Sequence, residues 1–154
     1  MARYLHDHGA PAFGLDLSDG MLAEARRRNP GLEFRQGDML ALAEADDSWG
    51  GAAAFYSLIH IPRERMPRAL SEIRRVLRPG GGLLAAVHIG QQVVHRAEWW
   101  GQAVAVDFIF YEPDELERLA RAAGFVVDEV IVREPYPDVE YPSRRAYLLA
   151  HKPD

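Results

Sequence analysis

Phe13-Gly14-Leu15-Asp16-Leu17-Ser18-Asp19 is the stretch that decides the fold. A short apolar run ends here in a carboxylate, and a predicted helix follows at once with Ser18 suited to its N-cap. In an open α/β sheet, ligands lie at the carboxyl ends of the strands. An ionised carboxylate only accepts hydrogen bonds, so it can bind both hydroxyls of a ribose. Asp16 is therefore a candidate nucleoside contact, and a helix cap is the equally weighted alternative.

Length and composition indicate one soluble globular domain. The 154 residues suit a single core over residues 1–154, with 48% hydrophobic and 27% charged residues. A net charge of −5 argues against broad binding to nucleic-acid phosphates. The chain has no cysteine, which excludes disulfides and a thiolate nucleophile. Without a signal peptide or a run long enough to span a bilayer, we expect a cytoplasmic location and no membrane partner.

Strand and helix signals alternate along most of the chain. Apolar or alternating runs predict strands at 13–16, 32–36, 52–59, 83–87, 125–132 and 145–150. Helix patterns at 2–8, after Ser18, after Pro67 and after Pro113 separate these strands until the last two, which follow each other directly. Alternation favours a parallel sheet, and the directly linked final pair favours an antiparallel edge. We therefore predict an α/β protein with a Rossmann-like, mostly parallel sheet flanked by helices and an antiparallel C-terminal strand pair.

Several motifs in this order resemble the class I S-adenosylmethionine-dependent methyltransferases. They are Gly14-Leu15-Asp16-Leu17-Ser18, Gly37-Asp38-Met39, Ser57-Leu58-Ile59-His60-Ile61-Pro62 and Arg75-Val76-Leu77-Arg78-Pro79-Gly80-Gly81. The C-terminal part, with Glu112-Pro113-Asp114-Glu115-Leu116 and Ala122-Ala123-Gly124-Phe125, is similar to the small-molecule branch of that family. The resemblance implies S-adenosylmethionine as cofactor and methyl transfer to a small-molecule acceptor.

The resemblance also implies cofactor contacts at particular positions. Asp16 would bind the ribose hydroxyls, and Leu17 and Met21 would flank the adenosine. Asp38 would accept from the adenine amino group with Met39 beside it. The alternatives are core filling for the two methionines and a turn role for Asp38.

Tyr56 and Ser57, at the end of the fourth family strand, would line the methionine half of the cofactor. The family begins with a strand and a glycine-rich loop that precede the helix corresponding to residues 2–8. Nothing precedes Met1 here, so we expect a missing first strand and an N-terminally shortened chain. That strand would lie between the strands ending at Asp16 and at Ser57.

Two histidines are candidates for proton removal from the acceptor. His60 follows an apolar strand at the ligand-binding edge, and an unperturbed imidazole suits general-base work near neutral pH. His60 could equally cap the strand or bond to the next turn. His88 ends the adjacent strand and is a second candidate that contacts the substrate. No histidine or acidic cluster has metal-ligand spacing, so we predict no metal.

Residues 91–110 lack a clean period, which is typical of a binding loop or lid. Trp99, Trp100 and Tyr111 are its substrate-contacting candidates within an aromatic-rich stretch that includes Phe108 and Phe110. Aromatic rings suit a flat or apolar acceptor, or a cation. A hydrophobic flap or a homodimer contact explains these residues equally well. The polar candidates are Arg96, Glu98 and Asp107, for which ordinary surface charge is the alternative.

Two other functions remain open on the sequence. A nicotinamide-dependent oxidoreductase also places an acid on a ribose, but it needs a glycine fingerprint before that acid. A non-catalytic remnant that binds a partner through its exposed sheet is the second alternative.

Overall fold

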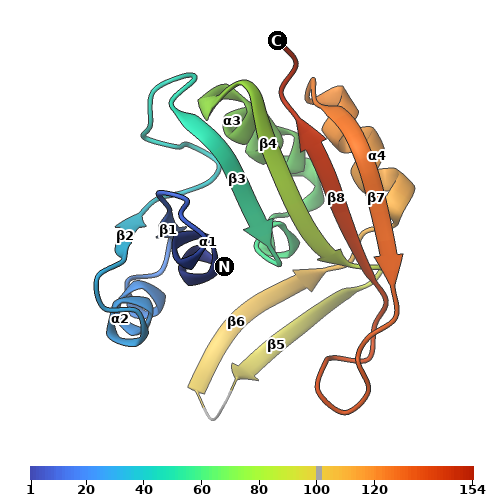
Figure 1. Ribbon diagram of the computed structural model, residues 1–154. Helices are drawn as coiled ribbons and strands as arrows, with labels where there is room; N and C mark the ends of the chain where they lie inside the picture. The colour runs from blue at the N-terminus through green and yellow to red at the C-terminus, as the bar shows by residue number, and fades with distance from the viewer. Residues whose placement is uncertain (100–101) are drawn as a thin grey trace. The chain divides into compact units, whose positions relative to one another are not determined.

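The computed structural model describes residues 1–99 and 102–154. The chain divides into two compact units, Met1–Ala43 (unit 1) and Glu44–Asp154 (unit 2). Figure 1 shows the strands and helices of both. The single domain expected from the sequence stays a prediction.

Unit 1 is built around one parallel strand pair. Its elements in chain order are α1 (Ala2–Asp7), β1 (Phe13–Asp16), α2 (Asp19–Arg28) and β2 (Glu33–Gln36). Strands β1 and β2 run parallel, with Phe13 opposite Glu33 and Asp16 opposite Gln36. A crossover through α2 joins them, as parallel strands require.

The start of α2 follows from its capping residue. Ser18 has extended backbone angles, and its Oγ accepts a hydrogen bond from the Met21 N–H at 3.3 Å. This bond satisfies one of the free N–H groups of the first turn and confirms the predicted N-cap. Leu22 is the buried side chain of the helix.

Unit 2 contains a four-stranded mixed sheet in the order β3-β4-β8-β7. The strands are β3 (Trp49–Phe55), β4 (Leu77–His88), β7 (Val126–Arg133) and β8 (Arg145–His151). β3 and β4 are parallel, whereas β8 pairs antiparallel with both β4 and β7. The predicted antiparallel C-terminal pair is thus confirmed. The strand expected at 52–59 ends at Phe55, because the chain turns into a short 3-10 helix, η1 (Leu58–His60).

Two amphipathic helices cover this sheet. They are α3 (Met66–Val76), which follows the 3-10 turn η2 (Arg63–Arg65), and α4 (Pro113–Ala122). Figure 1 shows both behind the sheet, on the same face. Leu70, Ile73 and Leu77 are buried, as their three- and four-residue spacing predicts, although Leu77 is already the first residue of β4. Burial of each such side chain contributes about 1.5–3 kcal/mol.

The segment 91–110 is a β-hairpin, so its prediction as an irregular loop was wrong. Strands β5 (Val93–Trp99) and β6 (Gln102–Ile109) pair antiparallel, with a bulge between Arg96 and Glu98. β-Branched residues such as Val94 and Val106 favour this pairing. Both faces of the hairpin mix apolar and polar side chains, which hid the two-residue period of a strand in the sequence.

The strand order and the covering helices make this an α/β Rossmann-like fold. In the described chain β1 pairs with β2 alone and β3 pairs with β4 alone. The parallel pairs place their carboxyl ends at Asp16 and Gln36 in unit 1 and at Phe55 and His88 in unit 2. These strand ends are where ligands bind in such folds.

Candidate functional site

Two carboxylates lie at one strand edge in unit 1. Asp16 is the last residue of β1, and Asp38 comes two positions after the end of β2. The strands are joined at this edge, because the Gly37 N–H donates to the Asp16 carbonyl oxygen at 3.0 Å. A Cβ on Gly37 would lie 2.8 Å from Leu15 Cδ1, so only glycine allows this close turn without a shift of Leu15.

Each carboxylate uses one oxygen to hold its own turn. Asp16 Oδ1 accepts from the Ser18 N–H, and Asp38 Oδ1 accepts from the Leu40 N–H, both at 2.8 Å. Within unit 1, every residue of which the structure describes, no cationic side chain pairs with either carboxylate. Both groups therefore keep acceptor capacity for a ligand.

Apolar side chains flank this acidic edge. Leu17 is 65% exposed and Met21 is 60% exposed, although both are large and hydrophobic. Met39, next to Asp38, is half-buried. Exposed apolar surface beside two hydrogen-bond acceptors fits a nucleoside, which has a flat base and a ribose with two hydroxyls.

Tyr56, at the end of β3, has the least favourable backbone conformation of the predicted site residues. Its φ of 55° lies in the left-handed region, which a bulky residue rarely adopts. The ring stacks on His88 with 5.0 Å between centroids, and its Oη lies 3.2 Å from Tyr147 Oη. Burial and then the Tyr147 hydrogen bond raise the pKa of Tyr56 to about 12, so the phenol stays neutral. Ser57 follows, half-buried, at the start of η1.

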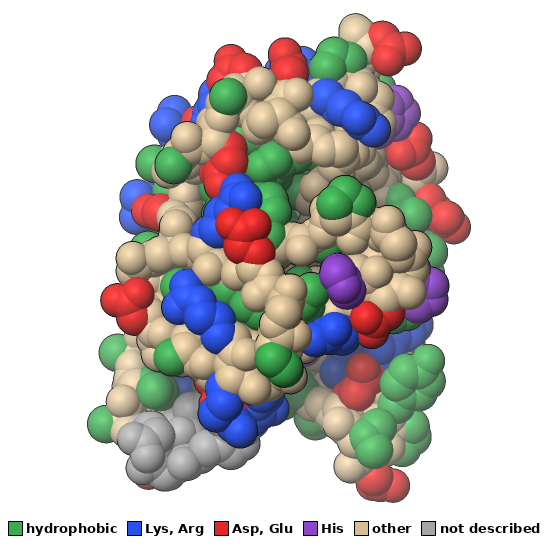
Figure 2. Space-filling view, turned by 60° about the vertical axis from the view of Figure 1, so that its left-hand side comes forward, with side chains coloured by type: hydrophobic (Ala, Val, Ile, Leu, Met, Phe, Trp, Pro, Cys, Tyr) green, Lys and Arg blue, Asp and Glu red, His purple; other side chains and the backbone are tan. Residues whose placement is uncertain are grey.

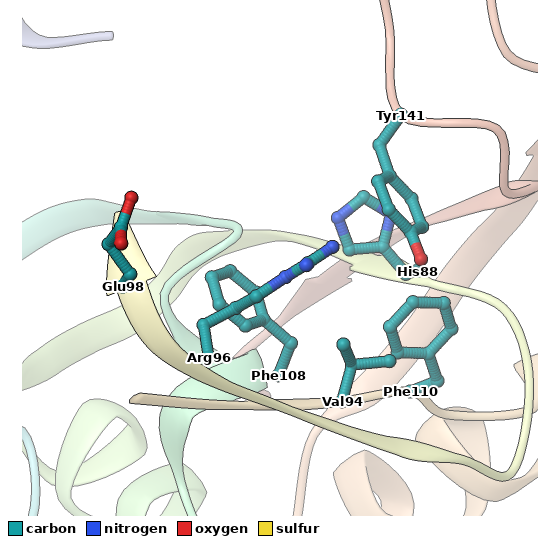
Figure 3. Close-up of a pocket in the computed structure, with 7 residues that line it drawn as sticks. All are labelled: His88, Val94, Arg96, Glu98, Phe108, Phe110 and Tyr141. Atoms are coloured by element: carbon teal, nitrogen blue, oxygen red, sulfur yellow. The ribbon is translucent and has the colours of Figure 1, made fainter. Parts of the chain in front are cut away.

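A cavity of about 390 Å³ lies in unit 2 between the β5–β6 hairpin and the end of β4 (Figure 3). We call it the hairpin pocket. Its lining residues are His88, Val94, Arg96, Glu98, Phe108, Phe110 and Tyr141. This volume lies within the range of small-molecule sites.

His88 is the predicted site residue that lines the hairpin pocket. Its ring stacks on Phe110 at 5.1 Å and meets Tyr141 edge-on at 5.7 Å. Its Nδ1 lies 2.7 Å from Ser143 Oγ. Burial and then the positive charge of Arg145 hold the pKa of His88 below its ordinary value, so the ring is neutral near pH 7.

His60 lies on η1 and is held by the hairpin. Its Nδ1 is 2.9 Å from the Asp107 carbonyl oxygen, and its ring meets Phe108 edge-on at 4.9 Å. A carbonyl oxygen only accepts hydrogen bonds, so His60 Nδ1 carries the proton. The neutral ring then has its free lone pair on Nε2, as a general base requires.

Tyr111, a further predicted substrate residue, does not line this pocket. Tyr111 is fully buried, and its hydroxyl donates to the Ile61 carbonyl oxygen at 3.1 Å. It packs in the core, with the guanidinium of Arg63 over its ring, and does not line the hairpin pocket. Trp100 lies outside the described residues, as does the side chain of Trp99.

Sequence reasoning missed two residues that line the pocket. Val94 lies in the segment predicted as a loop. Recognising that segment as two antiparallel strands would have placed Val94 opposite Phe108. Tyr141 lies far along the chain between β7 and β8, and no local signal connects it with His88. Phe108 and Phe110 were recognised only as members of an aromatic stretch.

Surface charge, possible metal ligands and possible membrane spans are the remaining features of the described residues that bear on function. On the face seen in Figure 2, acidic and basic side chains are interspersed. Across residues 1–99 and 102–154, no group of three or more His, Cys, Asp or Glu side chains could hold a metal ion. Among the helices of that part of the chain, none has the length and apolar character needed to cross a membrane.

Comparison with known proteins defines the family. A sequence-family model described as a methyltransferase domain matches residues 1–81, just over half of the chain. A demethylmenaquinone methyltransferase of Renibacterium salmoninarum is 38% identical over 80 residues, which are 52% of this chain and 33% of that protein. The match thus spans about a third of the length of this curated relative.

Solved structures share the fold. A methyltransferase from Methanosarcina mazei, described as S-adenosylmethionine-dependent, has a TM-score of 0.83 at 20% identity over 99% of this chain and 87% of its own. The 1,6-didemethyltoxoflavin-N1-methyltransferase of Burkholderia thailandensis has a TM-score of 0.76 at 21% identity over 99% and 65%. That structure holds 1,6-didemethyltoxoflavin and S-adenosylhomocysteine.

The Rossmann-like fold therefore defines a class of α/β proteins whose ligands lie at the carboxyl ends of the strands. Within that class, the chain belongs to the methyltransferase domain family, whose cofactor is S-adenosylmethionine.

Proposed function

We propose that this protein transfers a methyl group from S-adenosylmethionine to a small-molecule acceptor. The observation that carries the proposal is that two carboxylates, Asp16 and Asp38, lie at one edge of the β1–β2 sheet without a cationic partner in unit 1. Family membership supports the same function.

The residues of unit 1 fit the adenosine half of the cofactor. Asp16 would accept hydrogen bonds from the ribose hydroxyls, and Asp38 would accept from the adenine amino group. The exposed side chains of Leu17 and Met21 would flank the base, with Met39 beside Asp38. In unit 2, Tyr56 and Ser57 stay the predicted contacts of the methionine half.

The hairpin pocket is the proposed acceptor site. The cofactor supplies an electrophilic methyl group on a sulfonium, so the protein's task is to position the acceptor, exclude water and remove a proton. Phe108, Phe110 and Tyr141 supply walls that exclude water. His60 contacts Phe108 of the pocket wall but is not itself among the lining residues; it stays the proposed base, because its Nδ1–H is fixed on the Asp107 carbonyl oxygen and its Nε2 can accept a proton. A homodimer and the absence of nucleic-acid partners stay predictions from the sequence.

Calorimetric titration of the whole chain with S-adenosylmethionine tests the cofactor site. Asp16→Asn keeps an oxygen that can accept from the Ser18 N–H but loses the charge and one acceptor. We expect this variant to bind S-adenosylmethionine about tenfold or more weakly, as for the loss of a charge-assisted hydrogen bond. Asp19→Asn, an exposed acid in the first turn of α2, is the matched control and should bind like the parent.

A parallel titration with NADH separates the rival functions. Tight NADH binding without S-adenosylmethionine binding would establish the oxidoreductase alternative. If a folded sample binds neither cofactor, the partner-binding remnant becomes the better explanation. Equal affinity of the Asp16→Asn variant and the parent for S-adenosylmethionine would remove Asp16 from the site.

A further inference from the structure

One face of the hairpin is aimed at the hairpin pocket. Val94, Arg96 and Glu98 alternate along β5, so their side chains share a face. Phe108 of β6 stands directly opposite Val94. The pocket therefore has an apolar floor from the hairpin, with two charged side chains on the same strand.

Flat rings line the end of the pocket nearest β4. His88 lies between the rings of Phe110 and Tyr56, and Tyr141 meets both His88 and Phe110 edge-on. Such an array of ring faces and edges matches a planar aromatic ligand better than an aliphatic one.

The guanidinium of Arg96 is available to a ligand at this end. Figure 3 shows it extended along the pocket in the direction of His88, whereas the Glu98 carboxylate lies at the opposite end. Among residues 1–99 and 102–154, the side chain of Arg96 has no hydrogen-bond or ion-pair partner. An unpaired guanidinium on an apolar wall is a site for a carboxylate, which it can bind through two parallel hydrogen bonds.

The charged cluster that acts on His88 contains two arginines and one carboxylate. Arg133 and Arg145 share one carboxylate, Glu140, at 2.8 and 3.4 Å. This cluster keeps a net positive charge, and Arg145 is almost fully buried. Burial is the main cause of the lowered pKa of His88; the charge of Arg145 lowers it further, and the charge of Glu140 acts in the opposite direction. A cationic ligand is therefore disfavoured where the rings converge, and an anionic one is favoured.

We propose that the hairpin pocket binds a planar aromatic carboxylate, with its ring among Phe108, Phe110 and Tyr141 and its carboxylate on Arg96. The further step, that this carboxylate is the methyl acceptor, rests on the proposed methyl transfer. The binding itself rests only on the pocket.

Two probes of the same shape test the proposal. We would titrate the whole chain with 2-naphthoate and with 2-naphthamide, which differ in charge but hardly in size. Naphthoate should bind about tenfold more tightly than the amide. Arg96→Gln should remove this preference by weakening naphthoate alone. The matched control is Arg65→Gln, an exposed arginine of η2 outside the pocket, which should leave the preference intact.

A second variant tests the aromatic wall separately. Tyr141→Ala should weaken both probes by the same factor, about threefold or more, and keep the preference for the anion. Because Tyr141 is exposed on the loop between β7 and β8, its removal leaves the core intact.

Three results would overturn the proposal. They are equal affinity of the parent for both probes, a preference that survives Arg96→Gln, and no binding of either probe at millimolar concentration. The S-adenosylmethionine titration runs in parallel and is judged separately. If the chain does not bind S-adenosylmethionine but still prefers naphthoate through Arg96, methyl transfer is refuted and the carboxylate site is not. If the chain binds S-adenosylmethionine but shows no such preference, the carboxylate site is refuted and methyl transfer is not.

Discussion

Tyr56 shows how a single strained residue organises the site in unit 2. A non-glycine residue in the left-handed region costs of order 1–3 kcal/mol and persists only when its surroundings demand it. Stacking on His88 and the contact with the Tyr147 hydroxyl hold Tyr56 in this conformation. The strain lies at a strand end, where the family resemblance predicts a cofactor contact.

His60 carries the prediction at the residue scale. In His60→Gln, the side-chain amide can still donate to the Asp107 carbonyl oxygen, but it has no basic nitrogen. With 1-hydroxy-2-naphthoate as acceptor, we expect formation of S-adenosylhomocysteine to slow by about 100-fold, while affinity for S-adenosylmethionine stays unchanged.

His95→Gln is the matched control for this measurement. The His95 ring contacts the same residue, with its Nδ1 at 2.8 Å from Asp107 Oδ1, on the other face of the hairpin. It should retain the parent rate. A rate for His60→Gln within twofold of the parent would exclude His60 as the base.

The connection between β7 and β8 is the element that completes the hairpin pocket. Glu140 fixes it, because its carboxylate accepts two hydrogen bonds from Arg133 at 2.8 Å and one from the Tyr136 N–H at 2.7 Å. Arg145 donates to the carbonyl oxygens of Tyr141 and Ser143. These bonds place Tyr141 against His88.

Stability at low pH tests this element. The hydrogen bonds from Arg133 and then from the Tyr136 N–H lower the pKa of Glu140 from 4.5 to about 2. A group whose pKa is lower in the folded state stabilises the fold above its unfolded value and loses that effect as the pH falls through the folded one. In urea unfolding, Glu140→Gln should therefore be less stable than the parent at pH 7, and the difference should shrink as the pH falls from 4.5 toward 2.

Glu117→Gln provides the comparison for Glu140. Glu117 forms an exposed ion pair with Arg121 on α4, a type of pair that contributes little to stability. This control should differ little from the parent at any pH. If Glu140→Gln lowers the free energy of unfolding by the same amount at pH 7 and pH 3, the charge of the carboxylate does not hold the connection between β7 and β8.

At the scale of the whole molecule, the two ligands should protect different residues. Hydrogen exchange of the chain with S-adenosylmethionine should slow at residues 13–21 and 36–40 of unit 1, because the proposed adenosine contacts lie there. Exchange with 2-naphthoate should slow along β5, β6 and residues 134–144 of unit 2. Naphthoate protection confined to unit 1, or no cofactor protection at residues 13–21 and 36–40, would contradict the assignment.

Local chemistry explains what could be predicted. Ser18 caps α2 through its own hydroxyl, and Asp16 and Asp38 each hold a turn within two residues. The parallel pairing then follows from the alternation of strands and helices, which places both carboxylates at one edge. The hairpin was missed because its strands mix polar and apolar residues on both faces.

The sequence by itself determined the α/β alternation, the start of α2 at its Ser18 cap and the acidic strand edge, because capping, periodicity and turn chemistry act over a few residues. Only the tertiary structure decided that Tyr141 meets His88, that Tyr111 is a core residue and that Arg96 faces an aromatic cavity. Those contacts join segments about 50 residues apart in the chain. They depend on strand pairing and on shared ion pairs such as those of Glu140, which no local pattern encodes.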